Sequence, residues 1–105
     1  MKHYPVIISN QAKQSLKEIV SYIKKDSPQA AEYVKNALIA LMRSLGTAPE
    51  KYSKEFLLED TGKNYRSVTQ WRYKIIYLYT GKKVLVLDII HTSMDPKEIK
   101  RVEKK

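Results

Sequence analysis

The sequence predicts an α+β fold with an N-terminal strand, a long antiparallel helical hairpin and a short C-terminal helix. We expect the hairpin to pack on a mostly antiparallel sheet of about four strands. Residues 10–25 and 28–45 repeat apolar residues at helical spacing, whereas the runs after residue 64 are short and rich in Val, Ile and Tyr. The length of 105 residues suits a single domain, residues 1–105.

The N-terminal part predicts a short strand followed by a helix. Residues 4–8, YPVII, are a β-rich run, and Ser9 or Asn10 then offers an N-cap for a helix that ends near Lys25. The apolar residues of this helix recur at the spacing of one helical face. They are Ala12, Leu16, Ile19, Val20 and Ile23.

A second helix is expected directly after a tight turn. Ser27 is a candidate N-cap, and Pro28 falls at the first helical position, where its missing N–H costs nothing. Gly46 then ends the helix. The apolar stripe comprises Ala30, Val34, Ala37, Leu38, Leu41 and Leu45. Two such helices form an antiparallel hairpin, and their apolar stripes need a shared surface to cover.

The remaining chain predicts three strands and a closing helix. Residues 46–63 fit neither period, so we expect a partly ordered connection in which Phe56, Leu57 and Leu58 tuck under the domain. Gly81 is the first central residue of the turn from Thr80 to Lys83 and favours a type II′ hairpin. Asp95 is the expected N-cap of the closing helix. The strands are expected at residues 64–70, 71–79 and 84–91, and the helix at 96–105. The helices should cover one face of the sheet and leave the other partly open.

Charge and composition restrict the class of protein. The 20 Lys and Arg residues outnumber 11 Asp and Glu, giving a net charge of +9, which favours acidic partners such as nucleic acid or an acidic protein surface. The chain has no cysteine, which excludes disulfides and thiolate zinc sites. Because no apolar run is long enough for a secretory signal or a membrane span, we expect a soluble cytoplasmic protein.

A basic and aromatic segment is the first candidate for function. Residues 63–83 contain six basic side chains, five aromatic ones and no acid. Basic groups can bind phosphates and aromatic rings can stack on unpaired bases, although a half-buried strand with solvated charges has the same pattern. The candidate partner surface comprises Lys63, Tyr65, Arg66, Trp71, Arg72 and Lys74.

Strand register adds candidate catalytic residues. If Thr80 pairs with Lys83, then Leu78 faces Leu85, Ile76 faces Leu87, Lys74 faces Ile89 and Arg72 faces His91. Arg72 and His91, joined by Arg66, are candidates for phosphodiester cleavage, with His91 in acid–base work and the arginines on the developing charge. The alternative is a strand-end histidine that hydrogen-bonds to a loop.

Other active-site and cofactor patterns are not met. His91, Ser93 and Asp95 superficially resemble a hydrolase triad, but they lie within five residues, and Asp95 is better used as a helix cap. Neither histidine stands at a recognised metal-ligand spacing from the carboxylates. The sequence contains no GxGxxG and no Walker A motif, so we expect no cofactor and no metal.

The ordered set of segments resembles the RelE/ParE superfamily of small bacterial toxins, also called plasmid-stabilisation proteins. The segments are VIIS, NQAKQSLKEIVSYI, SPQAAEYVKNALIALMRSLGTAP, YRSV, WRYKIIYLY and VLVLDIIHTSMDP. The resemblance covers nearly the whole chain and implies a type II toxin–antitoxin system. In such a system a cognate, often acidic antitoxin binds the toxin in a hetero-oligomer and neutralises it. The charge of +9 agrees with an acidic partner.

The superfamily divides by mechanism, and the resemblance favours the ParE-like branch. ParE-like members inhibit DNA gyrase, have a long helical hairpin and are not enzymes, whereas RelE-like members are ribosome-dependent mRNA endonucleases. In this sequence Thr69, Gln70 and Met94 stand where the RelE pattern favours arginines. Our first hypothesis is therefore a ParE-like gyrase inhibitor that arrests growth. The alternatives are a metal-independent mRNA endoribonuclease that uses Arg66, Arg72 and His91, and a non-toxic relic that still binds antitoxin.

Overall fold

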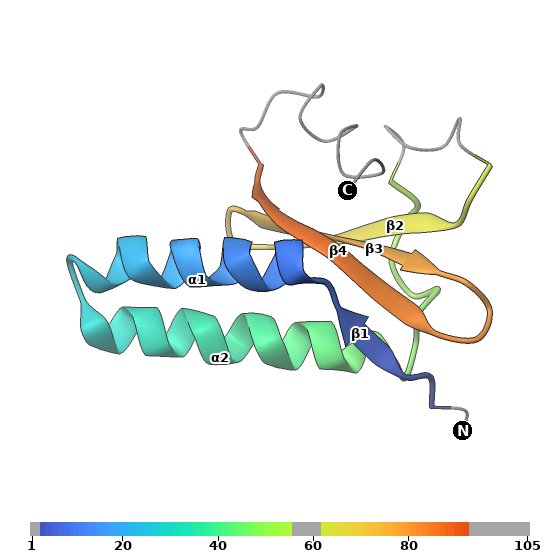
Figure 1. Cartoon of the computed structure of the whole chain (residues 1–105), viewed down its shortest axis with the longest axis horizontal. Helices are drawn as coiled ribbons and strands as arrows, with labels where there is room; N and C mark the ends of the chain where they lie inside the picture. Colours follow the sequence, from blue (N-terminus) through green and yellow to red (C-terminus); the bar gives the residue numbers. More distant parts are fainter. Residues whose placement is uncertain (1–2, 56–61, 93–105) are drawn as a thin grey trace.

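The computed structural model describes residues 3–55 and 62–92 and confirms the α+β class (Figure 1). The elements are β1 (Val6–Ile8), α1 (Asn10–Lys24), α2 (Pro28–Ser44), β2 (Tyr65–Gln70), β3 (Tyr73–Tyr79) and β4 (Val84–His91). The two helices lie side by side as an antiparallel hairpin next to the sheet (Figure 1). The expected tuck of Phe56–Leu58 and the closing helix over 96–105 lie outside the described residues.

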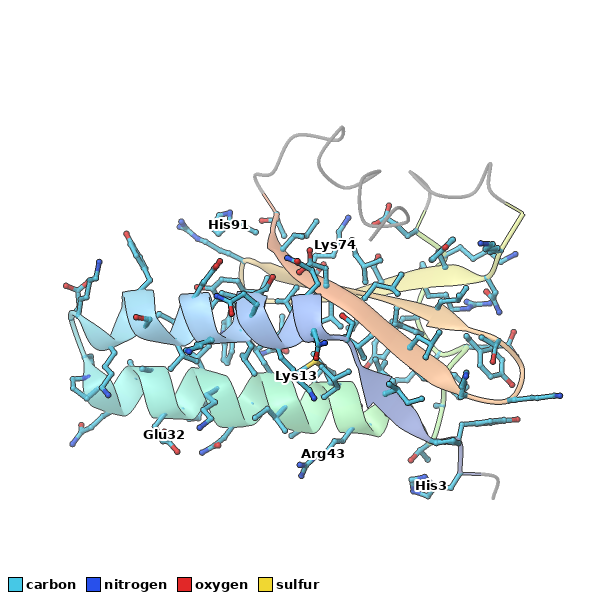
Figure 2. All side chains as sticks on the ribbon, in the orientation of Figure 1. His3, Lys13, Glu32, Arg43, Lys74 and His91 are labelled. Atoms are coloured by element: carbon cyan, nitrogen blue, oxygen red, sulfur yellow. The ribbon has the colours of Figure 1, made fainter. Side chains whose placement is uncertain are left out.

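Both predicted helix starts are confirmed. The Ser9 hydroxyl accepts a hydrogen bond from the Ala12 amide at 3.0 Å, and the Ser27 hydroxyl accepts one from the Ala30 amide at 3.1 Å. The polar face of α2 points away from the sheet, as Glu32 and Arg43 show in Figure 2. One residue of the predicted stripe is wrong: Ala30 is exposed and its neighbour Ala31 is buried, on the same helical face as Leu38 and Met42.

The four strands form one sheet in the order β1-β4-β3-β2. β1 runs parallel to β4, and the other two neighbouring pairs are antiparallel, so the expected sheet is mostly antiparallel with one parallel edge. The outer edge of β2 is partly covered by the connection, since the Glu55 amide donates to the Tyr65 carbonyl at 2.9 Å and Lys54 forms a bridge with Arg66.

A β-bulge in the β3–β4 pair corrects the predicted register. Leu78 faces Leu85 as expected, but the register shifts between Ile76 and Tyr77. Beyond the shift Ile76 faces Asp88 instead of Leu87, and Lys74 faces Ile90 instead of Ile89. His91 faces Tyr73 instead of Arg72. The extra residue of a bulge changes which side chains share a face, and no residue type in this sequence marks its position.

The two turns of the sheet differ in backbone conformation. Gly81 has φ 91°, as predicted for the first central residue of its turn. The β2–β3 turn consists of Trp71 and Arg72, so β3 begins two residues later than predicted. Trp71 has φ 55°, and a bulky side chain in this left-handed region costs about 1–3 kcal/mol.

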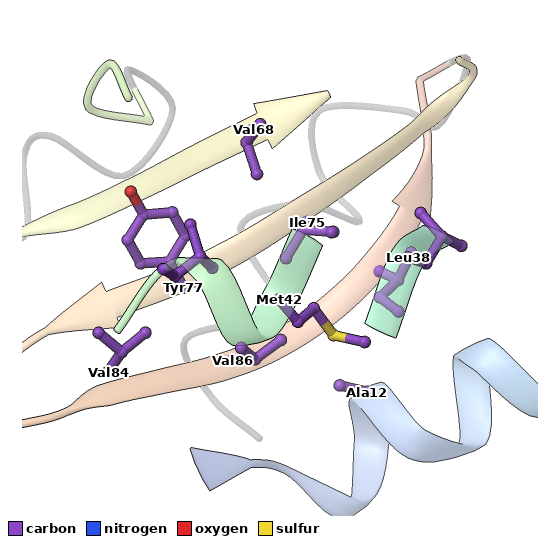
Figure 3. Packing of buried hydrophobic residues seen from close by; sticks show 10 residues of the cluster. Ala12, Leu38, Met42, Val68, Ile75, Tyr77, Val84 and Val86 are labelled. Atoms are coloured by element: carbon purple, nitrogen blue, oxygen red, sulfur yellow. The ribbon is translucent and has the colours of Figure 1, made fainter. Parts of the chain in front are cut away.

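The main core lies between the helical hairpin and one face of the sheet (Figure 3). Strand residues from β2, β3 and β4 point toward the helices there, and Leu38 and Met42 of α2 are fully buried among them. A smaller apolar cluster covers the opposite face of the sheet and comprises Tyr65, Ile76 and Ile90. The sheet is therefore apolar on both faces, and the second face is less open than the sequence predicted. Neither described helix is both long and apolar enough to cross a membrane.

Candidate protein-interaction surfaces

Arg66 is held by the connection that precedes its own strand. Its guanidinium donates to the Tyr52 carbonyl at 2.6 Å and to the Asn64 side-chain oxygen at 3.0 Å, and it lies 3.4 Å from the Glu50 carboxylate. The side chain is only 13% exposed. Its donors are therefore directed into the protein, where they fix the connection against β2.

Arg72 and His91 do come together, although not as a cross-strand pair. Both line an open cleft of about 570 Å³ between α1 and the far end of the sheet. Each is exposed, and the His91 ring meets the Tyr73 ring edge-on at 6.0 Å. Arg66 is not part of this group, because it lies further back along β2. Gln70 is the last residue of β2 before the turn that carries Arg72, and it is four residues, or about 13 Å at the strand rise, beyond Arg66.

The cleft that holds Arg72 and His91 also contains two carboxylates. Asp88 is 5% exposed, accepts from the Ser15 hydroxyl at 2.5 Å and accepts from the Ile89 amide at 2.8 Å. Glu18 of α1 lines the same cleft. Two carboxylates beside one arginine give the cleft a mixed charge, which disfavours the approach of a phosphodiester.

The predicted basic and aromatic surface is divided between different environments. Lys74 forms a 2.8 Å ion pair with the buried Glu55, whose carboxylate also accepts from the Ser67 hydroxyl at 3.2 Å. Tyr65 is buried in the second cluster. Lys63 is exposed before the start of β2, whereas Trp71 and Arg72 are exposed at its other end. Of the six residues, only Trp71 and Arg72 form a contiguous exposed pair.

Two tyrosines of β3 have raised pKa values. Burial raises the pKa of Tyr77 to about 12, and its hydroxyl donates to the Pro49 carbonyl at 2.7 Å. A side-chain hydrogen bond with Tyr4, together with burial, raises the pKa of Tyr79 to about 12. Both phenols stay neutral near pH 7.

The helical hairpin carries a groove that sequence reasoning missed. Leu16 and Val20 form its apolar floor, and the groove has a volume of about 400 Å³. Its charged rim comprises Lys13, Lys17, Lys24 and Lys35, with no acidic residue. Lys13 lies over the junction of the two helices in Figure 2. The spacing of Lys13, Lys17 and Lys24 in the sequence was a usable signal, because it places three cations on one helical face.

The described residues offer no metal site. Within residues 3–55 and 62–92, no three His, Cys, Asp or Glu side chains are grouped closely enough to hold an ion. What the described part of the chain presents is a mixed-charge cleft, a lysine-rimmed groove and an exposed Trp71–Arg72 turn. These features suit the binding of another macromolecule better than the binding of a small cofactor.

Two comparisons with known proteins found a match. A family model described as "ParE toxin of type II toxin-antitoxin system, parDE" matches residues 6–96. Among solved structures, the chain is similar to one titled "Chromosomal ParDE TA system from P. aeruginosa" with a TM-score of 0.71. The alignment covers 87% of this chain and 98% of that chain at 15% identity, which shows a shared fold. No curated protein sequence matches.

Proposed function

Because this chain belongs to the ParE toxin family of type II toxin–antitoxin systems, we propose that it arrests bacterial growth by inhibiting DNA gyrase until a cognate antitoxin neutralises it. The observation that carries the proposal is the family match over residues 6–96. Gyrase is the target that the resemblance to ParE-like toxins implies. In this role the protein is a binding inhibitor and not an enzyme.

The geometry of the candidate catalytic residues supports inhibition over RNA cleavage. Cleavage of a phosphodiester needs cations on the developing charge next to a proton-transfer group. Arg66 is directed toward Tyr52 and Glu50, away from the cleft of His91. Within that cleft Glu18 and Asp88 oppose the approach of a phosphate.

A second function, that of a RelE-like mRNA endonuclease, is favoured by one observation. Arg72 and His91 line the same cleft, so two of the three candidate residues face one space that a substrate could enter. In this function His91→Ala and Arg72→Ala would each reduce growth arrest strongly. Unchanged toxicity of both variants would eliminate this mechanism.

The antitoxin is the second partner, and the lysine-rimmed groove is the surface that suits it. An acidic amphipathic helix would place apolar residues on Leu16 and Val20 and carboxylates near the four lysines. Opposite charge would speed the encounter and fix the orientation of the two proteins. The net charge of +9 acts in the same direction over longer distances.

The test is an inducible-expression experiment followed by a gyrase assay. Thymidine and methionine incorporation are followed during the first minutes after induction. We expect thymidine incorporation to fall first and the purified toxin to inhibit gyrase supercoiling. An earlier fall in methionine incorporation would instead identify translation as the target. Normal growth together with stable antitoxin binding would show that only the non-toxic, antitoxin-binding role remains.

A further inference from the structure

Exposed aromatic side chains gather where the helical hairpin meets the β2–β3 turn. In the described part of the chain four large hydrophobic residues are strongly exposed: Ile7 (48%), Tyr22 (71%), Tyr33 (68%) and Trp71 (47%). The Tyr33 and Trp71 rings lie 5.9 Å apart, and Tyr22 lines the cleft next to Arg72. Three of the four thus belong to this one region, although they come from three different elements.

The same region contains an apolar hollow. Its volume is about 360 Å³, enough for one or two apolar side chains. It is lined by Ile23, Tyr33, Val34, Trp71, Arg72 and Tyr73. We call Tyr22 and these six residues the tip surface. Trp, Tyr and Arg are the residue types that dominate binding energy at protein–protein interfaces.

The backbone of Trp71 indicates that its side chain has a use beyond the fold. Its φ of 55° is a conformation that Gly or Asn adopts at lower cost. About half of the side chain remains exposed, so the packing of the fold uses only part of the ring. A strained, exposed aromatic residue beside a hollow is typical of a binding site.

Charge identifies the class of partner. Around Ile23, Tyr33 and Trp71, the exposed cations outnumber the exposed carboxylates. The cations are Lys24, Lys25, Lys35 and Arg72, and the carboxylates are Glu18, Asp26 and Glu32. The lining of the hollow is mostly apolar and aromatic, so it suits an apolar side chain of a protein better than a phosphate group. An acidic protein surface with an apolar anchor fits both the charge and the hollow.

We infer that the tip surface is where the toxin binds its protein target, through an apolar side chain of the target that is flanked by carboxylates. This inference rests on the proposed function, because it takes gyrase as the target. It assigns target and antitoxin to different surfaces. The antitoxin occupies the lysine-rimmed groove, and the target occupies the hollow beside Trp71.

The test uses Trp71→Gly, because glycine tolerates the backbone conformation that tryptophan strains. The variant is expected to fold and to bind antitoxin within about threefold of the unaltered chain. We expect its inhibition of gyrase supercoiling to weaken by about tenfold or more, as for loss of an interface anchor. Tyr33→Ala should act in the same direction. Ile7→Ser removes an equally exposed apolar side chain outside the tip surface and is the matched control.

Three outcomes would overturn the inference. Inhibition by Trp71→Gly and Tyr33→Ala equal to that of Ile7→Ser would show that the tip surface does not bind the target. Loss of antitoxin binding by these variants, with target inhibition kept, would assign the surface to the antitoxin. If the unaltered chain does not inhibit gyrase, the proposed function fails and the tip surface is not a gyrase site.

Discussion

The ion pair between Lys74 and Glu55 provides the sharpest test of whether Lys74 is structural or functional. Glu55 is 2% exposed, and its carboxylate lies 2.8 Å from the Lys74 ammonium, which is 23% exposed. At an effective dielectric constant of about 20, the attraction at that distance is about 6 kcal/mol before desolvation is subtracted. Removing one partner of a buried pair costs about 3–5 kcal/mol.

Lys74→Met is therefore expected to lower the free energy of unfolding by about 2–4 kcal/mol, the smaller value reflecting the partial exposure of the lysine. The double variant Lys74→Met, Glu55→Gln should recover most of the loss, because the remaining amide is neutral and still accepts from Ser67. Urea unfolding at pH 7, followed by circular dichroism, measures each value.

Lys82→Met is the matched control, since Lys82 is exposed in the β3–β4 turn. Its effect should stay within about 0.5 kcal/mol. If Lys74→Met costs no more than Lys82→Met, the reasoning is refuted, and Lys74 would again be a candidate for direct partner binding. If the folded double variant still arrests growth, Lys74 has a structural role only.

Three further substitutions test features of the fold. Gly46→Ala would bring a Cβ against the Tyr4 carbonyl oxygen, so unfolding should require about 1–3 kcal/mol less; an unchanged melting temperature would contradict this close approach. Ser27→Ala removes the N-cap of α2 and should cost about 1 kcal/mol in urea unfolding, and a neutral effect would show that the cap is dispensable. The pKa of Tyr77 is raised from 10.0 to about 12, so the fold favours the neutral phenol. Its contribution to stability is fully present below pH 10 and is lost as pH rises from 10 through 12, at up to about 1.4 kcal/mol per pH unit. Tyr77→Phe should flatten that decline, and an identical pH profile for both proteins would disprove the assignment.

For the described residues, the sequence was sufficient for the order and type of the elements, because their signals are local. Ser9, Ser27 and Pro28 mark helix starts through chemistry that acts within one turn, and each lies where it was predicted. Gly81 likewise marks its turn through its own φ. The phase of α2 is not fixed by a local signal, because Ala30 and Ala31 are both small and apolar and only tertiary contacts select Ala31 for burial.

The candidate site depended on contacts that no local pattern encodes. The bulge moves His91 opposite Tyr73 and leaves Arg72 in the turn, although both still line one cleft. Arg66 and Lys74 appeared free in the sequence, but residues 50–55 provide the carboxylates and carbonyls that bind them. Such pairs join positions 14 to 19 residues apart, so they depend on how the connection folds over the sheet.

The placement of the two proposed surfaces has a consequence for neutralisation. The groove extends from Lys13 to Lys24, eleven residues of α1, or about 17 Å at the helical rise. One end of the groove adjoins the tip surface. Lys24 and Lys35 of the groove directly follow Ile23 and Val34 of the tip surface in the sequence. An antitoxin helix of about eleven residues would fill the groove and leave the hollow beside Trp71 open to the target. An antitoxin that blocks the target by exclusion must therefore extend past Lys24 by at least one further turn, about 5.4 Å. Antitoxins shortened from that end should keep their affinity for the toxin and lose their ability to restore growth.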